Sequence, residues 1–321
     1  MAEILRALPA LTGFFTIGVL IGLGWLLARF GVLTSPHRKM MSLLALYVAS
    51  PALMFATMMQ ADLTRVFAHS VLASYIAIAA VAVLYISATI IRFHHDLAQG
   101  TVGTLLACYS NAGNLGIPVA AYALGDVAWI VPILLIQMVV LQPTALAILD
   151  WNQAKQQGRA TSLAKLITLP LRNPMTVGTL AGLAVNLIHR RLDWFALPEF
   201  VFHPIDMLGA VAVPLMLLAF GVSLRLDPRP SGGTEQVESW FTVTLKVVVQ
   251  PLIAFALASW VLHLDPAAVR AVTVVACLPP AQNIFIFASK YEVRMVFARD
   301  TTFRATMIAV ITIMVAATVL A

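Results

Sequence analysis

Long apolar runs alternate with short polar connections along nearly the whole chain. A spanning helix needs about 20 mostly apolar residues, and ten runs meet that requirement. They lie at 8–28, 40–59, 66–91, 100–124, 127–149, 174–189, 205–224, 240–262, 267–289 and 301–321. The runs are continuous, unlike the short alternating segments of a membrane β-barrel. The pattern therefore predicts an all-α integral membrane protein with ten transmembrane helices.

The composition supports this prediction and excludes other classes. Hydrophobic residues make up 61% of the 321 residues and charged residues 11%, against roughly 45–50% and about 25% in soluble proteins. The mean hydropathy is +0.92. Two cysteines are too few for a disulfide scaffold, and such a composition does not fit a nucleic-acid binder. The first run is interpreted as a helix, not a signal peptide, because Ala28-Arg29-Phe30 is a poor cleavage site.

The net charge of +6 is interpreted as a sign of topology. With the N-terminus outside, fourteen of the 20 basic residues fall on the inner side and five on the outer side. Basic residues accumulate in cytoplasmic loops, so the bias predicts a multi-pass protein of the cytoplasmic (inner) membrane with both termini outside. The five outer residues are Arg6, Arg65, Arg190, Arg191 and Arg270.

Three features recur between the two halves of the chain at nearly the same offset. The pair Gly18 and Gly22 recurs as Gly178 and Gly182, an offset of 160 residues. The motif Val-Ala-Ser-Pro-Ala-Leu-Met at 48–54 recurs as Val-Ala-Val-Pro-Leu-Met-Leu at 211–217. The third pair is Pro118 and Pro280. Residues 1–149 and 173–321 are therefore predicted to be five-helix repeats, joined by a basic cytoplasmic linker at 150–172.

Five helices per repeat is an odd number, so the second repeat must be inverted relative to the first. Inverted repeats are typical of transporters that work by alternating access, with the substrate site between the halves. The glycine pairs are expected to allow close helix contact, within a scaffold or at a dimer interface.

The fourth predicted helix contains the most unusual polar run within any span. Asn111, Gly113, Asn114, Gly116 and Pro118 follow one another there within eight residues. Pro118 cannot donate to the carbonyl of Asn114, and the glycines let the backbone leave helical angles. Unpaired backbone at this depth is tolerated only inside protein or along a cavity. The run thus predicts a broken helix, with asparagine amides free to bond the backbone or a ligand.

The ninth predicted helix carries the counterpart of this run. Pro279 and Pro280 remove donors, and Gln282 and Asn283 follow immediately. If both helices unwind and cross, two positively polarised helix N-termini converge, which favours a small anion such as a carboxylate. The alternative is a pair of proline-kinked helices whose asparagines bond locally.

Lys246 is the one formal charge deep within a predicted span. An intramembrane lysine is a candidate functional residue, here for attracting the anion or tethering the break; the alternative is snorkelling to the headgroups. No predicted span carries a carboxylate at its centre, which disfavours a proton relay. Ser50, Gln142 and Gln250 each precede a proline and, like Gln137, are interpreted as bonding to local backbone.

The run Asn-x-Gly-Asn-x-Gly-x-Pro, the proline-asparagine region of helix 9 and the basic mid-chain loop resemble the auxin efflux carrier (PIN-like) family over essentially the whole chain. The family includes plant carriers and bacterial members described as malonate transporters. The resemblance implies a fold similar to the bile-acid/sodium symporters, with helices 4 and 9 crossing beside the substrate. It also implies a scaffold of helices 1, 2, 6 and 7 that forms a homodimer. The long central hydrophilic loop of plant members is absent here.

Together these features predict a secondary transporter for a small organic anion, with malonate suggested by the resemblance. Helices 3–5 and 8–10 would move past the scaffold like an elevator. The predicted substrate-binding residues are Asn111, Gly113, Asn114, Gly116, Pro118, Lys246, Pro279, Pro280, Gln282 and Asn283. No enzymatic activity, cofactor or resident metal is predicted, and backbone oxygens at the breaks could hold a coupling Na+. The alternatives are a membrane-embedded enzyme and an anion channel.

Overall fold

The computed structural model describes residues 15, 18–61, 69–116, 119–126, 129–157, 174–192, 197–226 and 234–320. Every regular element in these ranges is a helix. The one strand-like pairing found there is a single antiparallel bridge between Ser110 and Pro280. The predicted all-helical class is thereby confirmed. Pro118 and linker residues 158–172 lie outside the described residues.

Within the described ranges, six helical stretches are long and apolar enough to cross a membrane. They are Ser35–Gln60, Ser70–Phe93, Val131–Gln156, Glu199–Leu226, Thr234–Val261 and Met295–Val319. Shorter apolar helices cover Gly18–Arg29, Leu97–Cys108 and Pro266–Ala276. With α10 (Pro174–Arg191), each predicted apolar run contains a helix. The crossing of a bilayer by ten helices and the inversion of the repeats stay predictions.

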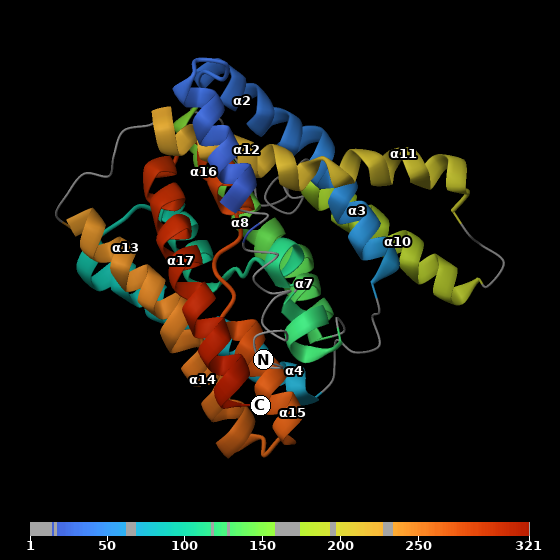
Figure 1. Cartoon of the computed structure of the whole chain (residues 1–321), viewed down its shortest axis with the longest axis vertical. Helices are drawn as coiled ribbons and strands as arrows, with labels where there is room; N and C mark the ends of the chain where they lie inside the picture. The colour runs from blue at the N-terminus through green and yellow to red at the C-terminus, as the bar shows by residue number, and fades with distance from the viewer. Residues whose placement is uncertain are drawn as a thin grey trace.

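Short π-helical turns divide several of these stretches into the helices labelled in Figure 1. The α-helices are α2 (Ser35–Leu44), α3 (Ser50–Gln60), α4 (His69–Ala88), α5 (Leu97–Cys108), α7 (Val131–Ile136), α8 (Gln142–Gln156), α10, α11 (Glu199–Ala210), α12 (Ala212–Leu226), α13 (Thr234–Thr244), α14 (Gln250–Ala256), α15 (Pro266–Ala276), α16 (Asn283–Tyr291) and α17 (Met295–Val319). The π-helical turns are Ala45–Ala49, Thr89–Phe93, Ala112–Gly116, Ala120–Leu124, Gln137–Leu141, Leu245–Val249 and Leu257–Val261.

Three of these turns end two residues before a proline, namely Pro51, Pro143 and Pro251. A proline removes one helical donor, and its ring crowds the carbonyl four residues earlier. A wider turn before the proline accommodates both effects within a continuous helix. The backbone itself therefore adapts to each proline. The sequence had suggested that the preceding polar side chains, Ser50, Gln142 and Gln250, would bond to the freed backbone groups.

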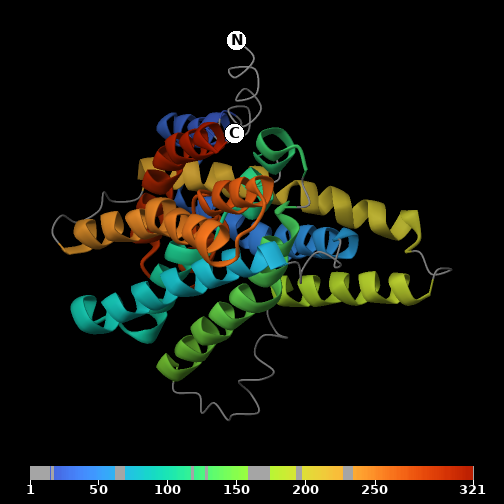
Figure 2. The same ribbon diagram turned by 90° about the horizontal axis from the view of Figure 1, so that it is seen from below.

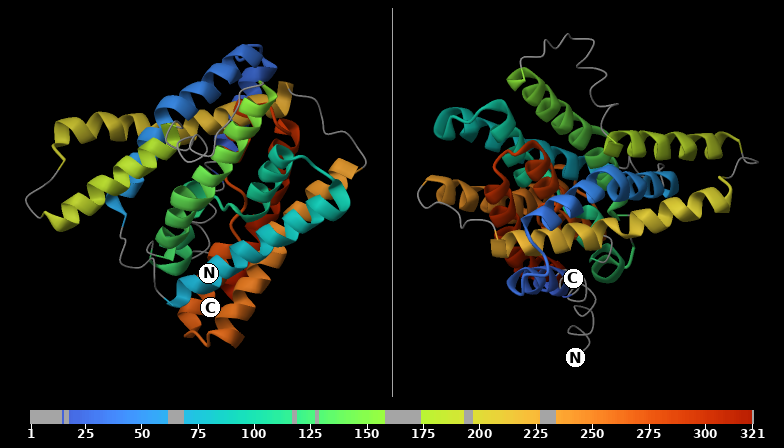
Figure 3. Two further views of the ribbon diagram at one scale, coloured as in Figure 1. Left: turned by 180° about the vertical axis from the view of Figure 1, so that it is seen from behind. Right: turned by 90° about the horizontal axis from the view of Figure 1, so that it is seen from above.

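The helices form two groups that face each other (Figures 1 and 2). In the first group, α3 packs against α10 and α11, and α2 packs against α12. In the second, α4 contacts α5, α14 and α15, while α13 and α16 pack on α17. Figure 3 shows the same division from behind and from above. Together with helix Gly18–Arg29, which packs on α12, the first group corresponds to the helices that the family resemblance assigns to a scaffold.

Close helix contact within the first group depends on glycines, but only partly on the expected ones. A Cβ atom at Gly178 or Gly182 would collide with the backbone of α3 at Pro51 or Phe55. By contrast, no atom of the described residues lies within 4 Å of a Cβ placed at Gly18 or Gly22. Close contact between helix Gly18–Arg29 and α12 occurs instead at Gly24 and Gly221. Among the described residues, Gly18 and Gly22 therefore lack the close contact expected within the scaffold, and the alternative of a dimer interface stays a prediction.

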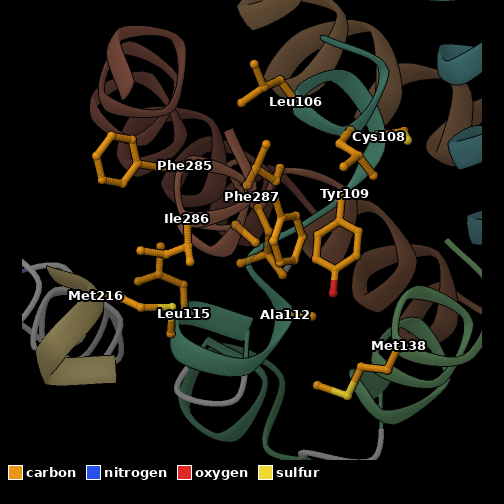
Figure 4. Close-up of a cluster of buried hydrophobic side chains, with 14 of the residues drawn as sticks. Leu106, Cys108, Tyr109, Ala112, Leu115, Met138, Met216, Phe285, Ile286 and Phe287 are labelled. Atoms are coloured by element: carbon orange, nitrogen blue, oxygen red, sulfur yellow. The ribbon is translucent and has the colours of Figure 1, made fainter. Parts of the chain in front are cut away.

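The main hydrophobic core surrounds the point where the two helix groups meet (Figure 4). It includes Tyr109, Ala112 and Leu115 from the interrupted fourth helix and Phe285 and Phe287 from α16, all nearly inaccessible to solvent. Met216 of α12 and Met138 approach the same region from other helices. These side chains pack closely against the interrupted backbone.

Candidate functional site

The fourth and ninth predicted helices are both interrupted, and the interruptions pair with each other. Helix α5 ends at Cys108 and is followed by Tyr109–Asn111, while α15 ends at Ala276 and α16 begins at Asn283. The backbone N–H of Asn111 donates to the Pro279 carbonyl at 2.7 Å, and the backbone N–H of Ala281 donates to the Tyr109 carbonyl at 3.1 Å. Each interruption thus satisfies backbone groups of the other, as burial away from water requires. We call residues 109–111 and 279–281 the crossing.

The first interruption lies earlier in the chain than expected. The sequence placed the break within Asn111–Pro118, but the extended backbone begins at Tyr109, and Ala112–Gly116 already forms a π-helical turn. The Gln137 side chain explains the earlier break, because its amide accepts a hydrogen bond from the Ser110 backbone N–H and donates to the Ser110 carbonyl at 3.1 Å. The Gln137 side chain therefore pairs with both backbone groups of Ser110, as a residue of a neighbouring β-strand would. Tyr109 adds a hydrogen bond from its hydroxyl to Gln142 Oε1 at 3.0 Å.

A cavity of about 400 Å³ opens directly beside the crossing, between the two helix groups. We call it the first chamber. Its lining comprises Leu53, Met54, Thr57, Tyr109, Ser110, Asn111, Ala112, Gly113, Leu134, Gln137, Met138, Val213, Met216, Ala281 and Asn283. This lining combines amides and hydroxyls on the crossing side with an apolar wall from α3 and α12. A larger cavity of about 530 Å³ lies away from the crossing, among α3, α10 and α11.

Three of the predicted site residues line the first chamber: Asn111, Gly113 and Asn283. Asn111 also donates from Nδ2 to Gln282 Oε1 at 3.0 Å, which holds its amide at the crossing. Pro279 and Pro280 belong to the crossing backbone. Gly116 packs instead against Ile130 and Leu278. Pro118 and the side chain of Asn114 lie outside the described residues.

The start of α16 offers fewer free donors than the sequence suggested. The Ile284 amide donates to Ala281 and the Phe285 amide to Gln282, at 3.2 and 3.0 Å. These hydrogen bonds, each to the carbonyl three residues earlier, satisfy two backbone N–H groups of the first turn of α16. The predicted anion site would therefore depend on the positive end of the helix dipole and on the Asn283 side chain.

Lys246 lies behind the crossing and is fully buried, with 0% of its surface exposed. Its ammonium donates to Ser110 Oγ and to Gln250 Oε1, both at 2.6 Å. Lys246 does not line the first chamber, and a hydroxyl of the lining separates it from that space. The snorkelling interpretation is wrong, because the side chain extends inward to the crossing. The sequence predicted that Gln250 bonds to local backbone; instead, its side-chain oxygen accepts this hydrogen bond from Lys246.

Sequence reasoning missed the apolar wall of the chamber. Leu53 and Met54 lie in the first copy of the repeated motif, 48–54, and Val213 and Met216 lie in the second, 211–217. The repetition was visible in the sequence, but nothing in it indicated that both copies face the crossing. Tyr109 and Ser110, just before the predicted run, were also missed.

Buried charges occur where the sequence predicted none. Asp300 and Arg299 lie within the first turns of α17, where Arg299 Nε and Asp300 Oδ1 are 2.6 Å apart. Glu238, on α13, is 1% exposed and accepts two hydrogen bonds from Arg294, at 2.6 and 2.7 Å. His95 Nε2 lies 2.8 Å from Glu238 Oε2, and the Tyr85 hydroxyl donates to Glu238 Oε1. These charges were missed because the helices begin earlier than hydropathy predicts and partners neutralise them.

We expect Glu238→Gln to destabilise the protein by about 3–5 kcal/mol, because it leaves the buried Arg294 guanidinium with only the more distant, partly exposed Glu235 carboxylate as a counter-charge. Burial alone would lower the pKa of Arg294, but the hydrogen bonds and charge of Glu238 raise it above its ordinary value. The melting temperature in detergent measures the effect. Glu235→Gln is the matched control, because Glu235 is 3.8 Å from Arg294 and one-third exposed; it should cost at most about 1 kcal/mol. Equal shifts would contradict this account.

Comparisons with known proteins identify the family of this chain. Residues 9–317 match the sequence model of the family described as "Membrane transport protein". A protein of Rhizobium meliloti (strain 1021) named "Putative malonate transporter" is 28% identical over 305 residues. The match covers 92% of this chain and 90% of that protein.

Proposed function

Because this chain belongs to the membrane transport protein family, we propose that it is a secondary transporter of a small organic carboxylate. It acts in the cytoplasmic membrane, with both termini outside. The observation that carries the proposal is the first chamber beside the crossing, which Asn111 and Asn283 both line. A carboxylate there accepts hydrogen bonds from amides and hydroxyls, and the α16 dipole favours its negative charge.

The position of the chamber supports an elevator movement. Its apolar wall comes from α3 and α12 of the first helix group, and its polar wall comes from the crossing in the second. Movement of the second group along the first would carry a bound anion with it. The proposed arrangement is ten transmembrane helices in two inverted repeats, with the first group as a scaffold that forms the homodimer.

Malonate or a similar short carboxylate is the proposed substrate class. It follows from the family resemblance and from the name of the Rhizobium meliloti protein. The chamber volume of about 400 Å³ leaves ample room for such an anion. An enzyme is disfavoured because the family whose model this chain matches is described as a membrane transport protein family. A channel is disfavoured because the crossing is closed by buried core residues.

Purified protein in proteoliposomes tests the function. We expect uptake of at least one radiolabelled C2–C5 carboxylate above that of protein-free liposomes, with saturation by the unlabelled compound. Imposed Na+, pH and potential gradients, applied separately, identify the coupling. Absence of saturable flux for every carboxylate, under all gradients and in both directions, would contradict the proposal.

A further inference from the structure

The larger cavity, of about 530 Å³, shares no lining residue with the first chamber. The ends of α3 and α10 and the start of α11 enclose it. Figure 1 shows α10 and α11 projecting beyond the rest of the molecule, on the far side from α13. The volume is within the range of about 300–1,000 Å³ that is typical of small-ligand sites. This cavity therefore has room for a ligand of its own.

Helices α3 and α10 run in the same direction and end beside the cavity. Gly182 of α10 lies against Phe55 of α3. One turn later, the Asn186 side chain donates to the carbonyls of Met58 and Ala61, at 2.9 and 2.8 Å. The residue numbers thus rise together along the two helices, as parallel packing requires. The predicted topology requires the same, because the second and sixth predicted helices both run from the inner to the outer side.

A positive charge is fixed at the wall of the larger cavity. Arg190, in the last turn of α10, donates from Nε to Asn186 Oδ1 at 2.9 Å and from a terminal nitrogen to the Ala61 carbonyl at 3.3 Å. Both bonds hold the guanidinium at the end of α3, where the helix dipole also favours a positive charge. The predicted topology places this residue on the outer side, where basic residues are scarce. A local role is therefore expected for it.

The same cavity also carries a negative charge. Glu199, the first residue of α11, is exposed and belongs to the lining. In the described part of the chain it forms no hydrogen bond or ion pair, so it does not neutralise Arg190. A dicarboxylate would be repelled by this charge, which disfavours a second substrate site. A ligand with both a phosphate and an ammonium group would find a complementary charge for each.

The rest of the lining is mostly apolar and adjoins exposed apolar helix surface. Met59, Val185 and Phe202 belong to the lining, one from each of the three helices. Nearby, Leu187 of α10 and Phe200 of α11 are 49% and 80% exposed. Large exposed apolar side chains beside a cavity are typical of a surface that contacts lipid or another protein. The cavity is therefore amphipathic, with charges at the helix ends and apolar walls around them.

From these observations we propose that the larger cavity binds the headgroup of a zwitterionic phospholipid such as phosphatidylethanolamine. The phosphodiester lies at Arg190, which suits a guanidinium, and the ammonium lies at Glu199. The acyl chains extend along the apolar surface of α10 and α11. One lipid thereby bridges the ends of three helices, and its binding stabilises the folded protein by mass action.

Native mass spectrometry of the delipidated protein in detergent tests this proposal. The protein is incubated with equal amounts of phosphatidylethanolamine and phosphatidylglycerol that have the same acyl chains. We expect one phosphatidylethanolamine to be retained per chain, with a preference of about fivefold, as one ion pair at a partly exposed site allows. The same lipid should raise the melting temperature. Glycerophosphoethanolamine, which is its headgroup without acyl chains, and inorganic phosphate should leave the melting temperature unchanged.

Two pairs of variants separate recognition from folding. Glu199→Lys should reverse the preference towards phosphatidylglycerol. Asp206→Lys makes the same change at an exposed position of α11 outside the lining and should keep the preference for phosphatidylethanolamine. Val185→Trp fills the cavity and should abolish retention. Val177→Trp, at an exposed position of the same helix, should retain the lipid.

Equal retention of both lipids by the unaltered protein, or of neither, would overturn the proposal. A preference that survives Glu199→Lys would do the same, because general apolar surface would then hold the lipid. If glycerophosphoethanolamine or inorganic phosphate alone raised the melting temperature, the cavity would be a site for a soluble solute and the proposal would be wrong. The experiment needs no transport activity, so its outcome is independent of the proposed function.

Discussion

Asn111→Ala should reduce carboxylate flux in proteoliposomes to the level of protein-free liposomes, with folded protein still present in the membrane. The variant removes an amide that lines the first chamber and leaves Gln282 without the partner it has in the crossing. A hydrogen bond to a charged group contributes about 1.5–3 kcal/mol, which corresponds to about a 10- to 150-fold loss from the ligand contact alone. Misalignment of the crossing adds to that loss.

Asn283→Ala should have the same effect, since Asn283 lines the chamber from the start of α16. The matched control is Thr57→Val, a nearly isosteric change in the same chamber. The Thr57 hydroxyl already donates to the Leu53 carbonyl of its own helix at 2.8 Å, so its removal should change flux less than about threefold. Near-normal flux in both asparagine variants would remove these residues from the site.

Lys246→Met should weaken the apparent affinity for the carboxylate, with KM raised at least about tenfold and the protein still folded. The buried ammonium touches the chamber only through Ser110. At roughly 6 Å, a unit charge at an effective dielectric of about 20 contributes about 2–3 kcal/mol to the binding of an anion. Methionine keeps the length of the side chain and removes the charge.

Two further variants separate the charge of Lys246 from its bond to the crossing. Ser110→Ala removes the hydroxyl and retains the ammonium, so its effect on KM should be smaller than that of Lys246→Met. Lys155→Met removes a positive charge from the exposed end of α8 and should leave KM unchanged. An unaltered KM in Lys246→Met would show that the lysine serves packing alone.

The sequence was sufficient to predict the helical membrane class and the interruption of the ninth helix. Both depend on local physical chemistry: long apolar runs, and two adjacent prolines that cannot donate. The exact start of the other interruption, at Tyr109, could not be read from the sequence. It depends on Gln137 and on the backbone of 279–281, which lie far away along the chain and complete the hydrogen bonds of Ser110.

The walls and charges around the site show the same limit of local reasoning. That Lys246 extends towards Ser110 and not towards the headgroups depends on which face of its helix meets the crossing. Glu238 lies just outside the predicted run 240–262, yet it is buried and bonded to Arg294 and His95. The close contacts at Gly24 and Gly221, in place of Gly18 and Gly22, depend on where helix Gly18–Arg29 crosses α12. Each of these features is set by tertiary packing.

The position of the bound carboxylate tests the central claim most directly. A brominated analogue of the carboxylate with the fastest flux can be located by the anomalous scattering of bromine in crystals of the complex. We predict a single strong peak in the first chamber, next to Asn111 and Asn283, that disappears in Asn111→Ala. A peak in the larger cavity among α3, α10 and α11, or one unaffected by Asn111→Ala, would contradict the account.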